Sequence, residues 1–558
     1  MNASNLRTGA ELIADSLRVH GVDTIYCLPG ESYLHVLDAF HDAPEIRLVV
    51  CRQEGGAAYM ADADSKITGK PGVLFVSRGP GACNAAVGIH TAYQDATPLI
   101  VFIGQIPRAS TERLAFQEID YRRMYAQSAK WIAQIDDAAR IPEMVSRAFH
   151  TATAGRPGPV ILVIPEDMQK DRANAEVGQR YATPRAAPAP DDLAQLRALM
   201  ERAARPFVLV GGSGWSAKAR EDLTAFAEAN ALPVLTAFRR QDLIDNRHPN
   251  FAGKAGLGKD PKLVKRIREC DLLIVVGTQL TDVITDEFKL LDIPRPKQTL
   301  VHVLSGADEL GRVYQPTLPL VATMPEFCAA ARAMAPIANP RWKKWTEDAA
   351  AEEREFRKPT KAPGPLNLGE IMAHLNQVLP DDAIVAQGAG NFTAWLRRFY
   401  IYRGYPTEIG PINGSMGYGL PAAIAAKVRH PGRTVVCLTG DGDFLMTGQE
   451  LATAVAENLA MVILLVNNGA YGTIRMHQET HYPGRIIATH LTNPDFAALA
   501  KAYGGFGETV SRTEDFPAAF ERALASGKTA LIQLILDPDI TSPSTTLTAL
   551  REKALAAR

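Results

Sequence analysis

The fold of this chain is decided by the stretch Leu438-Thr439-Gly440-Asp441-Gly442-Asp443-Phe444, which is followed downstream by Val466-Asn467-Asn468-Gly469. The β-branched residues at 433–437 predict a buried parallel strand, 447–457 predict a helix and 459–466 predict a second buried strand. This order makes a βαβ unit, with glycines and acids at the carboxyl end of its first strand. Ligands of open α/β sheets bind at that edge, so the sequence predicts an α/β protein with a site here.

The residues of this stretch suit a phosphorylated ligand that is held by a cation. Glycine lets the backbone approach an anion closely, and successive amides in the turn can hold phosphate oxygens. Asp441 and Asn468 offer a carboxylate and an amide oxygen, which with a main-chain carbonyl and phosphate oxygens would suit Mg²⁺. A lone Gly-Asp-Gly would be better explained as a tight turn. The paired Asn467-Asn468, roughly one βαβ unit downstream, favours the cation site instead.

A known family carries this combination of motifs. Gly440-Asp441-Gly442 with Asn467-Asn468 resembles the diphosphate and Mg²⁺ motif of thiamine diphosphate enzymes. The fuller run, which adds Phe444, Met446 and Gln449-Glu450-Leu451, resembles the acetohydroxyacid (acetolactate) synthase branch. The resemblance covers nearly the whole chain.

The resemblance implies thiamine diphosphate and Mg²⁺ as cofactors. It places Asp441, Asn468 and the carbonyl of Ala470 on the metal. It also implies cofactor contacts from residues beside these ligands, namely Gly442, Asp443, Tyr471 and Gly472.

The chain has 558 residues, which is too many for one hydrophobic core and suits about three domains. Helices, strands and glycine-containing turns alternate along it, so we expect an α/β fold of three consecutive doubly wound parallel-sheet domains. With the resemblance, these are a pyrimidine-binding domain, a central domain and a diphosphate-binding domain. Their expected limits are 1–171, 190–335 and 366–540, followed by a tail at 541–558.

Segments between these blocks are expected to be linkers. The Ala- and Pro-rich 172–190 is one, and 335–365 is the other; its charged run Glu352-Glu353-Arg354-Glu355 is interpreted as a solvated face. The tail is expected to be a short exposed helix without chemistry. The central domain opens with Gly211-Gly212-Ser213-Gly214, a possible nucleotide-binding turn that tight packing explains at least as well.

The composition excludes several classes of protein. Lys and Arg number 60 against 61 Asp and Glu, which does not suggest binding to nucleic acid or an anionic membrane. The polar start at 1–5 does not resemble a signal peptide, and no apolar run reaches the roughly 20 residues of a membrane span. The six cysteines lack a Cys-x-x-Cys pair, and several are expected in the core rather than in disulfides or metal sites. We therefore expect a cytoplasmic protein.

Glu54 is the expected catalytic residue. By itself it is better explained as a carboxylate at a helix N-terminus, but the helix-weakening pair Gly55-Gly56 requires a reason such as close approach. In the resembled family this Glu-Gly-Gly-Ala start carries the glutamate that hydrogen-bonds the cofactor's aminopyrimidine. Glu54 is thus expected both to bind the cofactor and to exchange a proton with it.

The glycine-rich segment Asn413-Gly414-Ser415-Met416-Gly417 would usually be a flexible turn before a helix. Here it resembles the family segment whose carbonyl, at Gly414, receives the aminopyrimidine amino group. The unbranched side chain of Met416 would wedge the cofactor into its bent shape. Gly388 and Asn391, at the end of another strand, would add diphosphate contacts.

Two further stretches rest on the resemblance alone. Gly30 would present an amide near the reacting carbonyl, with Glu31 beside the substrate, and the loop of Phe116 and Gln117 would approach the substrate. In the family, the halves that contain Glu54 and the diphosphate motif come from different subunits. The resemblance therefore implies a homodimer or homotetramer with active sites between subunits.

Departures from the family concern the substrate. Acetohydroxyacid synthases usually carry an Arg-Phe-Asp-Asp-Arg run in the central domain, where this chain has Gln279 and Val283 in place of both arginines. Flavin (FAD) is therefore doubtful, because charged contacts to it are missing. His477 falls where those synthases have tryptophan, and a substrate contact by it is an open alternative to a solvated helix residue. Without a matching arginine, we expect neutral aldehydes, or simple protonation, to outcompete a second 2-oxo acid as acceptor.

The favoured function is thiamine diphosphate- and Mg²⁺-dependent decarboxylation of a 2-oxo acid, with carboligation of the carbanion to a carbonyl acceptor. A non-ligating decarboxylase or C–C lyase, including the 2-hydroxyacyl-CoA lyase type, is an alternative on the same scaffold. A homologue that binds the cofactor without turnover is a third possibility. Glyoxylate carboligase is disfavoured because it lacks the glutamate that Glu54 supplies here, and CoA-processing relatives usually have Asn-Asn-Gly-Gly where this chain has Asn468-Gly469-Ala470.

Overall fold

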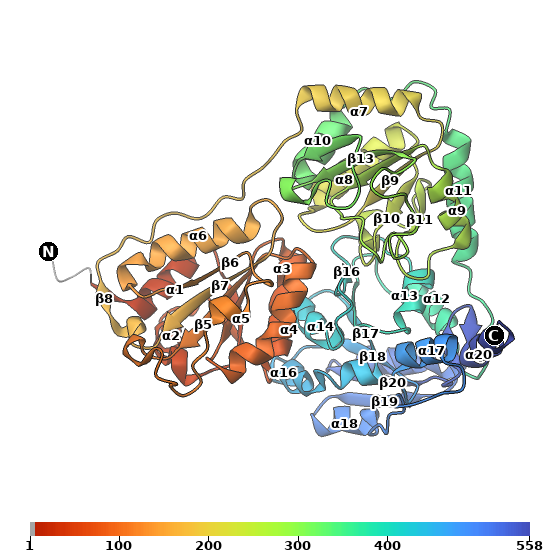
Figure 1. The fold of residues 1–558 in the computed structure, drawn as a ribbon. Helices are drawn as coiled ribbons and strands as arrows, with labels where there is room; N and C mark the ends of the chain where they lie inside the picture. Colours follow the sequence, from red (N-terminus) through yellow and green to blue (C-terminus); the bar gives the residue numbers. More distant parts are fainter. Residues whose placement is uncertain (1–5, 558) are drawn as a thin grey trace. The chain divides into compact units, whose positions relative to one another are not determined.

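The computed structural model describes residues 6–557 and divides into two compact units. The first comprises the chain up to Pro184 together with Ile424–Arg429 and Thr447–Asn458, and the second comprises the remaining segments. Figure 1 shows three sheets with covering helices along the chain, and in each sheet all six strands pair in parallel. The predicted fold class is confirmed. The domain limits themselves stay a prediction.

The first sheet lies in the first unit and has the strand order β3-β2-β4-β5-β7-β6. Phe75, Phe102 and Leu162 pack in one core cluster with residues of three helices, α1, α2 and α6. Their chain neighbours, such as Leu74 and Val101, are buried as well but lie outside that cluster. Successive side chains of a strand point to opposite faces, so helices cover both faces of the sheet. The elements are β2 (Thr24–Cys27), β3 (Arg47–Val50), β4 (Gly72–Val76), β5 (Leu99–Gln105), β6 (Trp131–Gln134), β7 (Pro159–Pro165), α1 (Gly9–Val19), α2 (Leu34–His41), α3 (Glu54–Thr68), α4 (Pro80–Gln94), α5 (Tyr121–Met124) and α6 (Ile141–Thr153).

The second sheet has the order β11-β10-β9-β12-β13-β14 and lies in the second unit. Two core clusters cover its faces: Val208 and Ile274 belong to one, and Leu209 and Val275 to the other. The elements are β9 (Pro206–Val210), β10 (Val234–Thr236), β11 (Phe251–Lys254), β12 (Leu272–Val276), β13 (Thr299–Leu304), β14 (Leu318–Val321), α7 (Pro190–Arg202), α8 (Ala217–Ala229), α9 (Pro261–Glu269), α10 (Met324–Ala333) and α11 (Lys343–Phe356).

The third sheet has the order β16-β15-β17-β18-β20-β19. Strand β17 ends at Gly440 and α15 begins at Asp441, while β18 ends at Asn467. Gly440 is paired with Val466, so Asp441 and Asn467 emerge at the same edge of the sheet. The elements are β15 (Ile384–Gln387), β16 (Glu408–Ile409), β17 (Val435–Gly440), β18 (Val462–Asn467), β19 (Phe506–Val510), β20 (Ala530–Ile535), α12 (Leu368–Val378), α13 (Thr393–Phe399), α14 (Gly419–Arg429), α15 (Asp441–Phe444), α16 (Leu451–Ala456), α17 (Gly472–His481), α18 (Phe496–Ala502) and α19 (Phe516–Ala525).

Three strands that the sequence patterns missed in the first two sheets lie at sheet edges. Strands β6, β11 and β14 end the orders of the first two sheets, and none is a continuous buried run. In β14, buried and exposed residues alternate and Pro319 interrupts the donors, as is typical of edge strands. Central strands such as β5 and β12 are buried along their whole length, which makes them apolar on both faces and easier to predict from the sequence.

Predictions about two connecting segments are confirmed in part. The second linker contains helix α11, in which Arg354 and Glu355 are exposed, as expected of a solvated face, whereas Glu353 is buried and pairs with Lys254 at 3.2 Å. The tail forms β21 (Ile540–Ser542), β22 (Thr545–Thr546) and α20 (Leu547–Ala556), and α20 packs on α17. Arg551 of α20 donates to the fully buried Glu479 of α17, with one Nε–Oε2 distance of 2.8 Å. The prediction of a short exposed helix in the tail is confirmed, because Leu547 is the only buried residue of α20 (547–556), but the packing of this helix on α17 depends on a partner far away in sequence.

The sequence analysis also made predictions about the start of the chain, about membrane spans and about the cysteines. The polar start at 1–5 lies outside the described residues. None of the helices within 6–557 combines the length and the apolar character that crossing a membrane requires. All six cysteines are free thiols, and five of them are buried, as expected; Cys83 is exposed.

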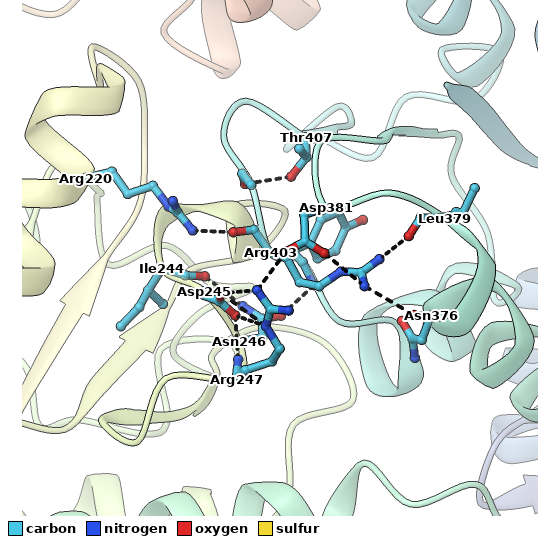
Figure 2. Close-up of polar contacts among 12 residues, drawn as sticks. Arg220, Ile244, Asp245, Asn246, Arg247, Asn376, Leu379, Asp381, Arg403 and Thr407 are labelled. Carbon is cyan, nitrogen blue, oxygen red and sulfur yellow. Dashed lines mark hydrogen bonds and ion pairs between the residues drawn. The ribbon is translucent and has the colours of Figure 1, made fainter. Parts of the chain in front are cut away.

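Within the second unit, polar contacts join the central sheet to the third sheet, as Figure 2 shows. Arg220 donates to the carbonyl oxygen of Arg403 at 2.8 Å, and Arg247 donates to Asp381 at 2.9 Å. Asn246 exchanges two hydrogen bonds with the backbone of Tyr402, at 2.9 and 3.2 Å. Because these contacts use backbone groups and paired charges, they fix the two sheets in one arrangement.

A buried carboxylate lies at the same junction. Glu408 of β16 accepts hydrogen bonds from the backbone N–H of Gln241 and from the side chain of Gln387, the latter at 2.8 Å. Asp242 lies beside it, because its carboxylate accepts from the N–H groups of Thr407 and Glu408. Burial, and secondly the charge of Asp242, raises the pKa of Glu408 to about 7.

We predict that Glu408 makes folding pH-dependent. An unfolded glutamate titrates near pH 4.3, so between about pH 4.5 and 7 the folded state holds more protons than the unfolded state. The contribution of Glu408 to the free energy of unfolding therefore falls as pH rises through this window. Glu408→Gln should remove that dependence, so the variant should gain thermal stability relative to wild type between pH 5 and pH 8. Melting temperatures across this range, with the exposed Glu521→Gln as control, test this; a constant difference would contradict it.

Candidate functional site

A cavity of about 630 Å³ lies in the second unit, at the carboxyl ends of β15, β17 and β18. It is also bordered by loops of the central domain, including Phe238 and Leu257. Most residues that the sequence predicted for the diphosphate half lie in its wall. They are Asn391, Gly414, Met416, Asp441, Gly442, Asp443, Asn468, Ala470, Tyr471, Gly472 and His477.

Asp441 is the buried carboxylate at the edge of the sheet. Its Oδ1 accepts the N–H of Gly442 at 2.9 Å, and its Oδ2 accepts the N–H of Gly469 at 2.9 Å and the amide of Asn493 at 2.8 Å. These three donors are neutral. Burial raises the pKa of Asp441 above its ordinary value, although the hydrogen bonds offset part of this. A cation beside this carboxylate would favour its ionised form.

Asn468 follows β18 and lies in the cavity wall with Asp441. Its Oδ1 accepts the N–H of Ala470 at 3.3 Å, and a Cβ at Gly472 would lie 2.8 Å from its Nδ2. One carboxylate, one amide and a neighbouring carbonyl are the hard donors that Mg²⁺ takes when phosphate oxygens and water complete its shell. The residues present therefore fit a Mg²⁺–diphosphate group. Across residues 6–557, no cluster of three or more His, Cys, Asp and Glu side chains has the geometry of a metal site.

Asp443 is placed differently from its neighbour Asp441. Its carboxylate accepts the N–H of Ala389 at 3.0 Å, the N–H of Gly417 at 2.8 Å and the hydroxyl of Thr439 at 2.6 Å. A Cβ at Gly388 would lie only 1.7 Å from Asp443 Oδ2. Gly388 is thus a glycine because this carboxylate approaches it, and it is absent from the cavity wall. Asp443 therefore links two glycine-rich turns, because it accepts hydrogen bonds from Ala389 in one and from Gly417 in the other.

The turn before α14 brings Gly414 and Met416 into the cavity wall. Gly414 has φ +74°, and no atom lies within 4 Å of the position that a Cβ would occupy there, so backbone conformation rather than crowding favours glycine. The N–H of Gly414 donates to the carbonyl of Pro411 at 3.0 Å, and Ser415 N–H donates to Asn413 Oδ1 at 3.1 Å. The turn is therefore held by its own hydrogen bonds.

Among the described residues, three arginines lie in the cavity wall, and the sequence analysis assigned a role to none of them. Arg239 comes from the loop after β10, Arg397 from α13 and Arg475 from α17, where it pairs with Glu479 at 3.1 Å; Val283 lies in the same wall. The expectation of a neutral acceptor was based on the absence of the family's matching arginine, and it stays a prediction. Cations do reach the cavity, from positions that the family motif does not contain.

The first unit holds the residues expected around the catalytic glutamate. Glu54 begins α3, and its Oε2 accepts the side-chain amide of Asn84 at 2.9 Å. A Cβ at Gly81 would lie 3.2 Å from Glu54 Oε1. Gly81 and Asn84 lie near the start of α4, so the N-terminal ends of α3 and α4 meet at this carboxylate.

Close approach explains the glycine pair after Glu54, as predicted. A Cβ at Gly55 would lie 3.1 Å from the carbonyl oxygen of Asn84, and one at Gly56 would lie 2.6 Å from Glu450 Oε1. Glu450 is fully buried and accepts the N–H groups of Arg52 and Gln53 at 3.1 and 2.9 Å. A carboxylate beside the first residues of a helix stabilises that end, so Glu450 fixes the start of α3 and the position of Glu54.

The turn between β4 and α4 gathers the remaining predicted residues of the first unit. A Cβ at Gly30 would lie 2.6 Å from the Ser77 side chain, and one at Gly79 would lie 2.7 Å from Gln117 Cβ. Gln117 has φ +66°, and the adjacent Phe116 is 73% exposed. Gly30, Glu54 and Gln117 are therefore brought around this single turn.

Glu31 lies beside Gly30 but is engaged by an arginine. Arg78 Nη2 lies 2.7 Å from Glu31 Oε1, and Arg78 also contacts Glu166 at 3.4 Å. Glu31 is mostly exposed while Arg78 is nearly buried. The carboxylate of Glu31 therefore neutralises the nearly buried guanidinium of Arg78.

The glycine turn of the central domain is explained by packing. A Cβ at Gly212 would lie 1.7 Å from the carbonyl oxygen of Gly277, and one at Gly211 would lie 2.3 Å from Ala237 Cβ. The carbonyl of Gly211 also accepts the indole N–H of Trp215 at 2.7 Å. The turn needs glycines in order to fit beside β12, so nucleotide binding is not required to explain them.

Other residues of the site gave weak signals in the sequence. Asn493 donates from one amide nitrogen to both Asp441 and Asn467, and its position before Pro494 indicated only a turn. The strand–Gly-Pro-Gly–helix pattern at 79–81 was a usable signal, because it repeats the βα geometry of the diphosphate motif. Thr541 and Ser542 of the tail also line the cavity, and no local pattern indicated this.

Comparison with protein families matches three successive segments of the chain. Residues 7–124 match the thiamine pyrophosphate enzyme N-terminal TPP binding domain, and 193–331 match the central domain of the same enzymes. Residues 388–534 match the C-terminal TPP binding domain. These matches include both clusters of residues described above.

Curated relatives match over almost the full length. The acetolactate synthase large subunit of Parasynechococcus marenigrum is 33% identical, over 96% of this chain and 88% of the relative. Isozyme 1 of Escherichia coli is 31% identical, over 95% of this chain and 94% of the relative. The probable acetolactate synthase large subunit of Methanocaldococcus jannaschii is 29% identical, over 95% and 92%. The chain therefore belongs to the thiamine pyrophosphate enzyme family and is a thiamine diphosphate-dependent enzyme similar to acetolactate synthase large subunits.

Proposed function

We propose that the chain catalyses Mg²⁺-dependent decarboxylation of a 2-oxo acid and joins the remaining carbon unit to a carbonyl acceptor. The observation that carries this proposal is the cavity in which buried Asp441, neutral hydrogen-bond donors and glycine turns occur together. The full-length similarity to acetolactate synthase large subunits supports carboligation. When bound, thiamine diphosphate would supply the electron sink for the bond breaking.

The protein's own groups would bind and orient the cofactor and move one proton. Asp441, Asn468 and the carbonyl of Ala470 would hold Mg²⁺, with the turns at Asn391, Gly442 and Gly472 beside the diphosphate. The Gly414 carbonyl and Met416 would orient the aminopyrimidine. Glu54 would hold the exchanged proton on a carboxylate oxygen, with Asn84 fixing that oxygen's orientation. The proposal includes no flavin, because packing explains the central glycine turn.

We expect Asp441→Ala to abolish Mg²⁺-dependent retention of thiamine diphosphate. The variant removes the only carboxylate among the three proposed metal donors. Each charged contact is worth about 1.5–3 kcal/mol, so affinity should fall by at least roughly ten- to a hundredfold. Thermal-shift titration with thiamine diphosphate and Mg²⁺ measures this, with the exposed Asp515→Ala as control. An unchanged shift in Asp441→Ala would remove it from the metal site.

Glu54→Gln should retain the cofactor but slow proton exchange at its thiazolium carbon by about a hundredfold or more. The amide can still accept the hydrogen bond from Asn84, but it cannot take up the proton. Hydrogen–deuterium exchange followed by NMR gives the rate directly. Glu176→Gln, at an exposed position of the same unit, is the control. Wild-type exchange in Glu54→Gln would show that another group moves the proton.

We also propose that the chain assembles as a homodimer or homotetramer. Apolar side chains are exposed near Glu54: Val87 is 44% exposed, Val50 is 40% exposed and Phe116 is largely exposed. Val87 lies against the start of α3, since a Cβ at Gly55 would lie 3.1 Å from its Cγ1. Apolar exposure grouped in this way is typical of interaction surfaces.

Val87→Asp should therefore shift the protein toward monomer, because a charge would be buried at the contact. Analytical ultracentrifugation over a concentration series measures the mass. Leu524→Asp, at an exposed leucine of α19, serves as a matched control and should leave the mass unchanged. Equal masses for wild type and Val87→Asp would place the interface elsewhere.

A further inference from the structure

Arg397 is a buried cation whose hydrogen-bonding groups are incompletely used. It belongs to α13 and lies in the wall of the 630 Å³ cavity. Its Nε and Nη1 atoms are shielded from solvent, and within the described residues neither has a hydrogen-bond partner. A guanidinium carries five N–H donors in a fixed plane, so a buried one without acceptors destabilises the free protein.

The position of Arg397 is fixed by its surroundings rather than by an ion pair. Lys254 Nζ donates to the carbonyl oxygens of Arg397 and Arg398, and it pairs with Glu353 at 3.2 Å, which attaches the end of α13 to β11. The Cζ of Arg397 lies 5.0 Å from the ring centroid of Phe238. The guanidinium is thus held at the cavity by the ring of Phe238 and by helix α13, whose end is bound to Lys254.

A second cation increases the local positive potential. The Cζ of Arg239 also lies 5.0 Å from the Phe238 ring, and its Nη2 donates to the carbonyl of Gly388 at 2.8 Å. Burial, and secondly the charge of Arg239, lowers the pKa of Arg397 to about 9, while Glu408 opposes this weakly. The Glu408 carboxylate is occupied by Gln241 and Gln387. The cavity therefore holds positive charge that an incoming anion would neutralise.

We propose that Arg397 binds the carboxylate of a small 2-oxo acid acceptor and sets the preference for a charged over a neutral acceptor. This assignment rests on the proposed carboligation. A planar guanidinium matches a carboxylate through two parallel hydrogen bonds, which Nε and a terminal nitrogen can donate. Val283, which stands where related synthases carry an arginine, lines the same cavity, so the cation here comes from α13 instead.

The size of the cavity favours a small anion over a nucleotide. A volume of 630 Å³ suits one drug-sized ligand. The same cavity includes the glycine turns and Asp441 proposed for the diphosphate, so the cofactor would fill much of it. Only a molecule of a few heavy atoms would fit beside it at Arg397.

The test compares two unreactive probes of nearly equal shape on the cofactor-loaded protein. Lactate carries a carboxylate and lactamide carries a neutral amide in its place, and neither can be decarboxylated. Calorimetric titration of wild type should show tighter binding of lactate than of lactamide. Arg397→Gln should lose roughly ten- to a hundredfold in lactate affinity and leave lactamide unchanged, and Arg397→Lys should restore part of the loss.

Arg398→Gln is the matched control, because Arg398 is the adjacent arginine of α13 but is absent from the cavity wall. Its Nε donates to the carbonyl of Phe356 at 2.9 Å, and its Cζ lies 4.1 Å from the Phe356 ring. It should bind lactate as wild type does. Equal lactate affinity in Arg397→Gln and wild type would overturn the proposal. ADP is titrated as a third probe. If Arg397→Gln weakened only the binding of ADP, Arg397 would be assigned to a nucleotide site, which would also overturn the proposal.

Turnover gives an independent readout. With pyruvate and acetaldehyde compared as acceptors, Arg397→Gln should raise the KM for pyruvate ten- to a hundredfold and leave that for acetaldehyde unchanged. An equal rise for both acceptors would overturn the role in recognition. Absence of all turnover in a wild type that still prefers lactate would contradict the proposed function instead, while leaving the anion site in place.

Discussion

The arrangement of the cavity depends on one buried carboxylate, that of Asp443. It accepts hydrogen bonds from Ala389, Gly417 and Thr439, which belong to three different segments of the chain. Each partner lost from a buried carboxylate would cost roughly 1–3 kcal/mol, so the three turns are strongly coupled. The absence of a side chain at Gly388 allows the carboxylate to lie between them. Asp441, two residues earlier in α15, is thereby aimed into the cavity at a fixed position.

The two halves of the proposed chemistry use the same local device. In the first unit, the buried carboxylate of Glu450 accepts the N–H groups that precede Glu54, as Asp443 does for the turns of the second unit. In both places glycines bring the backbone close to a carboxylate that is itself out of reach of solvent. In both units a buried structural carboxylate thus fixes the position of a second carboxylate for which we propose a function, at the end of a strand or helix.

Some ionisable side chains are buried without an opposite charge beside them, which destabilises the folded protein and is typical of functional sites. Burial raises the pKa of both Asp441 and Glu408 and lowers that of Arg397, so each group is harder to ionise in the folded protein than in water. Such groups gather at functional sites because a ligand can supply the missing charge. Asp441 and Arg397 both lie in the wall of the cavity and carry opposite charges. The cavity is therefore suited to a cation beside Asp441 and an anion beside Arg397.

The sequence alone determined the class of fold and the residues of the diphosphate motif. Continuous apolar strands, the Gly440-Asp441-Gly442 turn and Asn467-Asn468 are local patterns, and parallel strands force their carboxyl ends to one edge. It also predicted the close approach that requires Gly55-Gly56, next to the proposed catalytic residue Glu54. Edge strands such as β14 escaped, because a half-exposed strand has no continuous apolar run. Only the tertiary structure decided which hydrogen bonds Asp443 and Glu450 accept, that Arg397 lies in the cavity wall, that Glu353 is buried and that the tail helix packs on α17. Those features come from contacts between segments far apart in the chain, and the spacing of residues along a sequence does not determine which distant charges share a buried space.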